Sequence, residues 1–86
     1  MYRAIFSRQA RKSFLALPTR QARHVRATIA SLQEEPRQPG TIKLEHAPVA
    51  QYRRRVGDWR ILFDIDDREQ ILAIIDIRKR DEHTYR

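Results

Sequence analysis

The sequence contains no cysteine among its 86 residues, which excludes disulfide bonds and metal sites built on thiolates. It has only 2 glycines, so it also lacks a glycine-rich loop of the kind that holds nucleotide phosphates. No apolar run is long enough to span a bilayer, and the first residues do not resemble a secretion signal. We therefore expect a cytoplasmic protein with no membrane partner.

Metal and nucleophile chemistry have little support either. The three histidines, His24, His46 and His83, show no metal-ligand spacing, and the acidic residues cluster in expected turns. The serines fall at expected helix caps or on helix surfaces, which does not favour a catalytic triad. We expect no metal, no cofactor and no small-molecule ligand.

Basic residues are abundant: 18 lysines and arginines oppose 11 acidic residues, and the formal net charge is +7. Such a charge points to a polyanionic partner, with nucleic acid as the first candidate and an acidic protein as the second. The chain length suits one small domain over residues 1–86.

The hydrophobic spacing predicts an α+β fold. Residues 2–6 alternate as a short strand, and Ser7 can cap a helix that ends at Pro18. A second helix, with Ala22, Val25, Ile29 and Leu32 on one apolar stripe, begins at residues 18–19 and stops before Pro36. The two helices form an antiparallel helical hairpin over one face of a sheet. Residues 36–51 read as a proline-rich loop with a short extended piece at 41–44. Residues 71–77 are almost entirely apolar, which is typical of a central or nearly central strand.

The stretch from Tyr52 to Phe63 predicts a β-hairpin, because Gly57-Asp58 separates two runs rich in β-branched and aromatic residues. With the final strand this hairpin forms a three-stranded antiparallel meander, so we expect one small twisted sheet. Counting outward from the turn gives the cross-strand pairs Val56 with Trp59, Arg55 with Arg60, Arg54 with Ile61, Arg53 with Leu62 and Tyr52 with Phe63.

Alternation along these strands places Arg53, Arg55 and Arg60 on one face and the apolar residues on the other. Like charges opposite one another destabilise a hairpin by about 0.2–1 kcal/mol, so an anion shared by Arg55 and Arg60 would satisfy both. The alternative is a solvated face with its charges splayed apart. Arg54 points to the core side, where it either extends its charged end to the sheet edge or marks a bulge. Lys43 either joins the arginines or points to water.

The last residues, 78–86, carry four cations and Tyr85 directly after the apolar strand. A frayed tail is one interpretation; the other is a functional segment beside the arginine hairpin. Guanidinium groups with a tyrosine and a histidine suit metal-free RNA cleavage, in which the ribose 2′-hydroxyl attacks the adjacent phosphorus. Tyr85 or His83 would then move the proton.

The hairpin pattern Tyr52-x-x-Arg55-Val56-Gly57-Asp58-Trp59-Arg60 and the closing Lys79-Arg80…Tyr85-Arg86 resemble the RelE/ParE superfamily of bacterial and archaeal type II toxins. Leu17-Pro18 and Lys43-Leu44 add weaker similarity. The resemblance implies a RelE-like fold. For the RelE branch it implies an endoribonuclease that cuts mRNA in the ribosomal A site and is neutralised by a cognate antitoxin.

The resemblance also implies site residues. The catalytic set would be Arg53, Arg55, Arg60, Arg80 and Tyr85, with His83 as an alternative base, and RNA-binding residues would be Lys43, Arg54, Arg78 and Lys79. The sequence departs from the family where lysine is common at the first two of these positions, where Arg54 replaces an apolar residue, and where Arg78 replaces a glycine.

Two other functions stay open. The ParE branch shares the scaffold and inhibits DNA gyrase by binding, whereas a nonenzymatic RNA-binding module would give Tyr85 no role beyond stacking on a base. For each toxin branch we expect a cognate antitoxin whose acidic, amphipathic segment covers the helical hairpin or sheet edge and approaches the arginines. For the RelE branch the second partner is mRNA on the ribosome.

Overall fold

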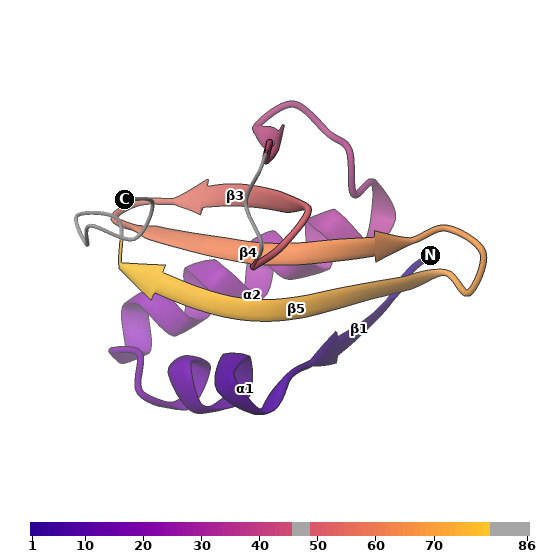
Figure 1. Ribbon diagram of the computed structural model, residues 1–86. Coiled ribbons are helices and arrows are strands. Elements are labelled where there is room, and N and C mark those ends of the chain that lie inside the picture. Colours follow the sequence, from indigo (N-terminus) through magenta and orange to yellow (C-terminus); the bar gives the residue numbers. More distant parts are fainter. Residues whose placement is uncertain (46–48, 80–86) are drawn as a thin grey trace.

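The chain, seen in Figure 1 as a computed structural model, is described over residues 1–45 and 49–79. Within these ranges the elements are β1 (Arg3–Phe6), α1 (Arg8–Leu15), α2 (Thr19–Glu34), β2 (Thr41–Lys43), β3 (Tyr52–Val56), β4 (Trp59–Asp66) and β5 (Ile71–Lys79). The strands form one sheet in the order β1-β5-β4-β3-β2. β1 is parallel to β5, and the other neighbours are antiparallel. The predicted α+β fold with its β3-β4-β5 meander is confirmed, and the short extended piece adds an edge strand.

The hydrophobic core lies between the two helices and one face of the sheet. Its buried residues come from α1 and the turn after it, from α2, and from the two longest strands: Ala10, Leu17, Val25, Ile29, Leu32, Ile61, Phe63, Ile65, Leu72, Ile74 and Ile77. The predicted apolar stripe of the second helix is therefore confirmed, since Val25 and Leu32 are completely buried. Within the described residues no helix is long and apolar enough to cross a membrane.

Ser7 fixes the start of α1 against the sheet. Its hydroxyl oxygen accepts a hydrogen bond from the Ala10 backbone N–H at 3.0 Å, which confirms the predicted N-cap. The same hydroxyl donates to the backbone carbonyl of Ile75 at 2.6 Å. One side chain thus caps the helix and ties it to the middle of β5.

The β3-β4 hairpin has the predicted register at all five pairs, from Val56 opposite Trp59 to Tyr52 opposite Phe63. Gly57 opens the turn with a φ of +60°, a left-handed conformation that glycine adopts without a steric cost. The rings of Tyr52 and Phe63 stack with centroids 5.7 Å apart. Local sequence therefore determines this part of the sheet.

The pairing of β4 with β5 contains a register shift. Phe63 faces Ile74 but Leu62 faces Asp76, so the pairing passes over Ile75. A residue inserted in this way reverses which side chains face the core beyond that point. Ile77 consequently joins the core, and Arg78 stands opposite Arg60 on the other face.

Candidate functional site

Four arginines gather on the face of the sheet that points away from the helices. Arg55 faces Arg60, and Arg60 in turn faces Arg78, so three of them start from three adjacent strands in one line. Arg53 lies two residues before Arg55 and therefore on the same face. We call Arg53, Arg55, Arg60 and Arg78 the arginine cluster. Cross-strand neighbours stand about 4.5–5.5 Å apart at Cβ, close enough for one phosphate to contact more than one of them.

The members of the arginine cluster differ in their exposure to water. Arg55 is exposed, whereas Arg53, Arg60 and Arg78 are partly buried. The Nε and Nη1 atoms of Arg60, in the middle of the line, are buried. A charge partly withdrawn from water attracts an anion more strongly than a fully solvated one, because water screens it less.

Asp76 holds one end of the line. Its Oδ2 accepts a hydrogen bond from Arg78 Nε at 2.8 Å, and Oδ1 accepts one from the Ser13 hydroxyl of α1 at 3.0 Å. Asp76 is 6% exposed, and among the residues that the structure describes it is the one charged residue that is buried. Asp76 was not among the residues predicted from the sequence, although a single acidic residue within the apolar run 71–77 was a usable signal.

A hollow of about 260 Å³ lies beside Arg53 and Arg55. Gly40 and Ile42 complete its lining, and Ile42 is 47% exposed. Gly40 has a φ of +103°, and a Cβ atom at this position would lie 3.2 Å from Cζ of Arg54. The hollow therefore combines two guanidinium groups with an apolar surface, a combination that suits the phosphate and the base of a nucleotide.

Lys43 and Arg54 lie on the opposite face from the arginine cluster. Lys43 pairs with Tyr52, whose ring packs against the core, so of its two predicted positions the one beside the arginines is wrong. Arg54 Nη1 donates to Oε1 of Gln38 at 2.6 Å, and its hairpin has no register shift. Arg54 thus extends its charged end away from the core, as one of the two interpretations predicted, but toward the loop after α2.

Only the beginning of the C-terminal part of the predicted site lies within the described residues. Lys79 is exposed at the end of β5, opposite Trp59. Arg80, His83 and Tyr85 lie outside the described residues. The structure therefore brings together Arg53, Arg55 and Arg60, and it adds Arg78, which was predicted only as an RNA-binding residue.

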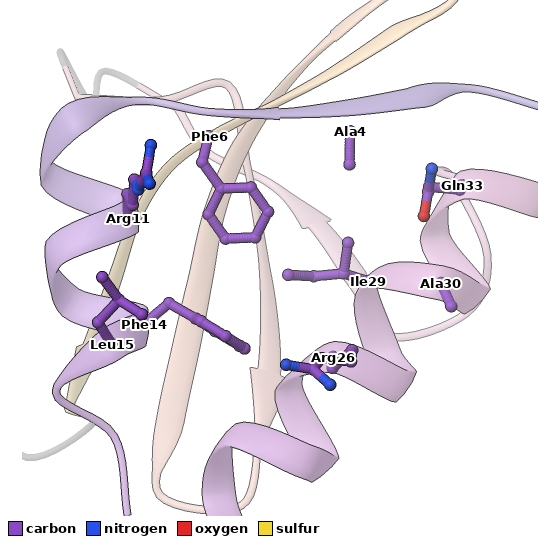
Figure 2. A pocket seen from close by; sticks show the side chains of 9 residues that line it. All are labelled: Ala4, Phe6, Arg11, Phe14, Leu15, Arg26, Ile29, Ala30 and Gln33. Atoms are coloured by element: carbon purple, nitrogen blue, oxygen red, sulfur yellow. The ribbon is translucent and has the colours of Figure 1, made fainter.

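A groove of about 580 Å³ opens on the other side of the molecule, between α1, α2 and β1 (Figure 2). The rings of Phe6 and Phe14 meet edge to face at its floor, with centroids 5.8 Å apart. Arg11 and Arg26 bring positive charge to this apolar lining, and Cζ of Arg26 lies 5.6 Å from the centre of the Phe14 ring. Leu15 at the rim is 73% exposed.

Comparison with protein families gives one match: the model of the ParE toxin of the type II toxin-antitoxin system parDE covers residues 4–84. No curated protein sequence matches the chain.

Several solved structures share the fold. The toxin-antitoxin complex RelBE2 from Mycobacterium tuberculosis contains a chain 26% identical to this one, with a TM-score of 0.80 over 92% of this chain and 98% of that chain. The archaeal RelE-RelB complex from Pyrococcus horikoshii gives 27% identity and a TM-score of 0.78, covering 94% of this chain and 97% of that chain. The isolated RelE toxin of E. coli reaches a TM-score of 0.81 over 99% of this chain and 92% of that chain; at 19% identity this likeness concerns the fold alone.

Proposed function

Because the chain belongs to the ParE toxin family of type II toxin-antitoxin systems, within the RelE/ParE superfamily, we propose that it arrests growth as a ribosome-dependent mRNA endonuclease. The observation that carries this proposal is the line of Arg55, Arg60 and Arg78 across three adjacent strands, with Arg53 beside it. A surface that only binds DNA gyrase does not require three guanidinium groups in one line.

The arginine cluster suits the charge that develops in RNA cleavage. The ribose 2′-oxygen forms a bond to phosphorus while the bond from phosphorus to the 5′-oxygen breaks. Negative charge builds up on the non-bridging oxygens during this exchange, and fixed guanidinium groups stabilise it through paired hydrogen bonds. No metal ion is needed for this step, because the arginines supply the positive charge.

Proton transfer belongs to the segment after β5. The 2′-hydroxyl must lose a proton, and the departing 5′-oxygen must gain one. We assign this exchange to Tyr85, with His83 as the alternative, and we assign charge stabilisation at the leaving group to Arg80. Lys79 would add a phosphate contact. Lys43 and Arg54 are left out of the proposed site because they lie on the other face of the sheet.

The second partner is a cognate antitoxin, and the groove between the helices and β1 is where we place its apolar contacts. The groove is lined mainly by apolar side chains and carries Arg11 and Arg26, so it suits an amphipathic segment with acidic residues. β1 is an edge strand of the described sheet and offers its backbone to an added strand. The groove and the arginine cluster lie on opposite faces, so a neutralising antitoxin would have to reach around the sheet or act from a distance.

Gyrase inhibition is the second candidate, and the name of the matching family favours it. One experiment separates the two functions. Wild type and the double variant Arg80→Ala with Tyr85→Phe are expressed from an inducible promoter, new 5′ ends in cellular mRNA are mapped, and gyrase supercoiling is assayed in parallel.

We expect new 5′ ends within codons that disappear in the double variant, while gyrase supercoiling stays normal. Growth arrest with intact mRNA and blocked supercoiling would instead assign the chain to gyrase inhibition, and the arginine cluster would then be a binding surface.

A further inference from the structure

Asp76 has no role in the proposed reaction, yet its carboxylate accepts hydrogen bonds from three different groups. Oδ1 accepts hydrogen bonds from the Ser13 hydroxyl at 3.0 Å and from its neighbour's backbone N–H, that of Ile77, at 2.8 Å. Oδ2 accepts the bond from Arg78 Nε, also at 2.8 Å. Burying a carboxylate is costly unless its oxygens are satisfied. Its contacts with a helix, with its own strand and with one arginine indicate what it does.

We propose that Asp76 is a positioning residue: it holds the Arg78 guanidinium in line with Arg55 and Arg60, so that the line can receive a phosphate. This inference rests on the proposed function. The contact to Asp76 engages one of the five guanidinium donors, and it sits at the end of the group nearest the backbone. The side chain is thereby oriented while its outer edge keeps its donors.

Repulsion between the like charges of the arginine cluster explains why Arg78 has to be held in position. Arg78 stands directly opposite Arg60, and facing like charges push long side chains apart into solvent. An arginine without an anchor samples many rotamers, and that freedom must be lost each time a phosphate is bound. A buried carboxylate two residues before Arg78 removes much of this freedom in advance.

The substitution Asp76→Asn tests this positioning role, because an amide accepts hydrogen bonds at its oxygen only, whereas a carboxylate accepts them at both oxygens. If its oxygen keeps the bonds from Ser13 and Ile77, its NH₂ group faces Arg78 Nε as one donor against another. If it flips, the Ile77 N–H loses its acceptor and the Ser13 hydroxyl has to accept from the amide instead of donating to it. Ser13→Ala is the matched control, since it removes one bond to Oδ1 and leaves the contact between Oδ2 and Arg78 in place.

Two readouts are measured on wild type, Asp76→Asn, Arg78→Ala, the double variant and Ser13→Ala. The first is single-turnover cleavage on programmed ribosomes, and the second is the NMR order parameter of the Arg78 Nε–H group. We expect cleavage to fall about 10²-fold in Arg78→Ala and about 10-fold in Asp76→Asn. We expect no further loss when Asp76→Asn is added to Arg78→Ala, a change within about twofold for Ser13→Ala, and a lower order parameter in Asp76→Asn.

A merely structural Asp76 would reduce cleavage equally in both backgrounds and leave the order parameter unchanged, and either result would overturn the inference. Arg78→Lys provides a second test if Asp76→Asn does not fold. Lysine keeps the charge but has no Nε–H to anchor, so wild-type cleavage in this variant would contradict the proposal. A wild type that never cleaves would overturn the proposed function instead, while the order parameter would still decide whether Asp76 positions Arg78.

Discussion

The two faces of the sheet use arginine differently. On the helix face, Arg26 lies over the Phe14 ring and Arg54 binds the side chain of Gln38, so neighbouring groups engage their charges. On the open face, Arg55, Arg60 and Arg78 stand opposite one another, and a carboxylate binds the last of them. The first arrangement serves packing, whereas the second keeps positive charge concentrated. We therefore expect substitutions on the helix face to change stability or partner binding, and those on the open face to change activity.

Arg60→Ala should show the largest separation between activity and stability. Removing the central guanidinium of the line should lower cleavage by about 10²- to 10³-fold, because a donor aimed at the developing charge is lost. The midpoint of thermal unfolding should change little, since the substitution also relieves repulsion within the arginine cluster. Arg68→Ala is the control: Arg68 is exposed in the turn before β5, and its loss should leave cleavage intact. Equal losses in the two variants would mean that only total charge matters.

Leu32→Ala should lower the stability of the fold and leave cleavage activity unchanged. Leu32 is completely buried in α2, and truncating such a side chain costs about 2–5 kcal/mol in the free energy of unfolding. Denaturant unfolding measures this loss. Cleavage per folded molecule should stay at the wild-type level at a temperature where the variant is folded. A specific loss of activity would show that the two faces are coupled through the core.

Leu15→Asp should weaken binding of the cognate antitoxin by about 10- to 100-fold, because it places a carboxylate at the rim of the apolar groove. Isothermal titration with the purified antitoxin gives the affinity, and cleavage without antitoxin should be unchanged. Val49→Asp is the matched control: Val49 is also exposed, but it lies in the loop between β2 and β3, outside the lining of the groove. Equal weakening by both substitutions would move the antitoxin contact away from the groove.

The smallest effect concerns the exposed pair of Arg37 and Asp67. Two hydrogen bonds from the Arg37 guanidinium, each 3.0 Å long, are the main reason that the pKa of Asp67 is lowered, and the Tyr2 hydroxyl adds to this effect. A carboxyl with a lowered folded-state pKa stabilises the fold above its unfolded pKa of about 3.9, and that contribution disappears as pH falls through the folded-state value.

The difference in unfolding free energy between wild type and Asp67→Asn should therefore be present at neutral pH and vanish in acid, as denaturant unfolding across that range can show. The difference should also shrink at neutral pH when both proteins carry Arg37→Gln, because only the contribution of the Tyr2 hydroxyl then remains. A difference that persists in acid would mean that the carboxylate charge is not its source.

Sequence alone predicted what local patterns determine. Gly57-Asp58 fixed the hairpin register, and Ser7 with the apolar stripe of α2 fixed the helices. The face of Lys43 stayed open because β2 is only three residues long and its orientation depends on pairing with β3. Residues Arg80, His83 and Tyr85 remain predictions of the family resemblance.

The role of Asp76 could not be predicted, because its contact on α1, Ser13, lies 63 residues away in the chain. Nor could the alignment of Arg78 with Arg60 be predicted by counting. Continued without a shift from Phe63 opposite Ile74, the pairing would have placed Ile77 opposite Arg60. The residue types of 71–79 do not indicate that the pairing of β4 with β5 skips Ile75.

The length of the last strand is therefore under as much constraint as its composition. Inserting one residue between Asp76 and Arg78 would leave every chemical group in the chain, yet it would turn the arginine to the helix face and take it away from its line. Insertions in the turn before β5 would have no such effect on the strand beyond it. When related sequences are aligned, the position of a single gap in this strand should therefore distinguish members that keep the arginine line from members that share only the scaffold.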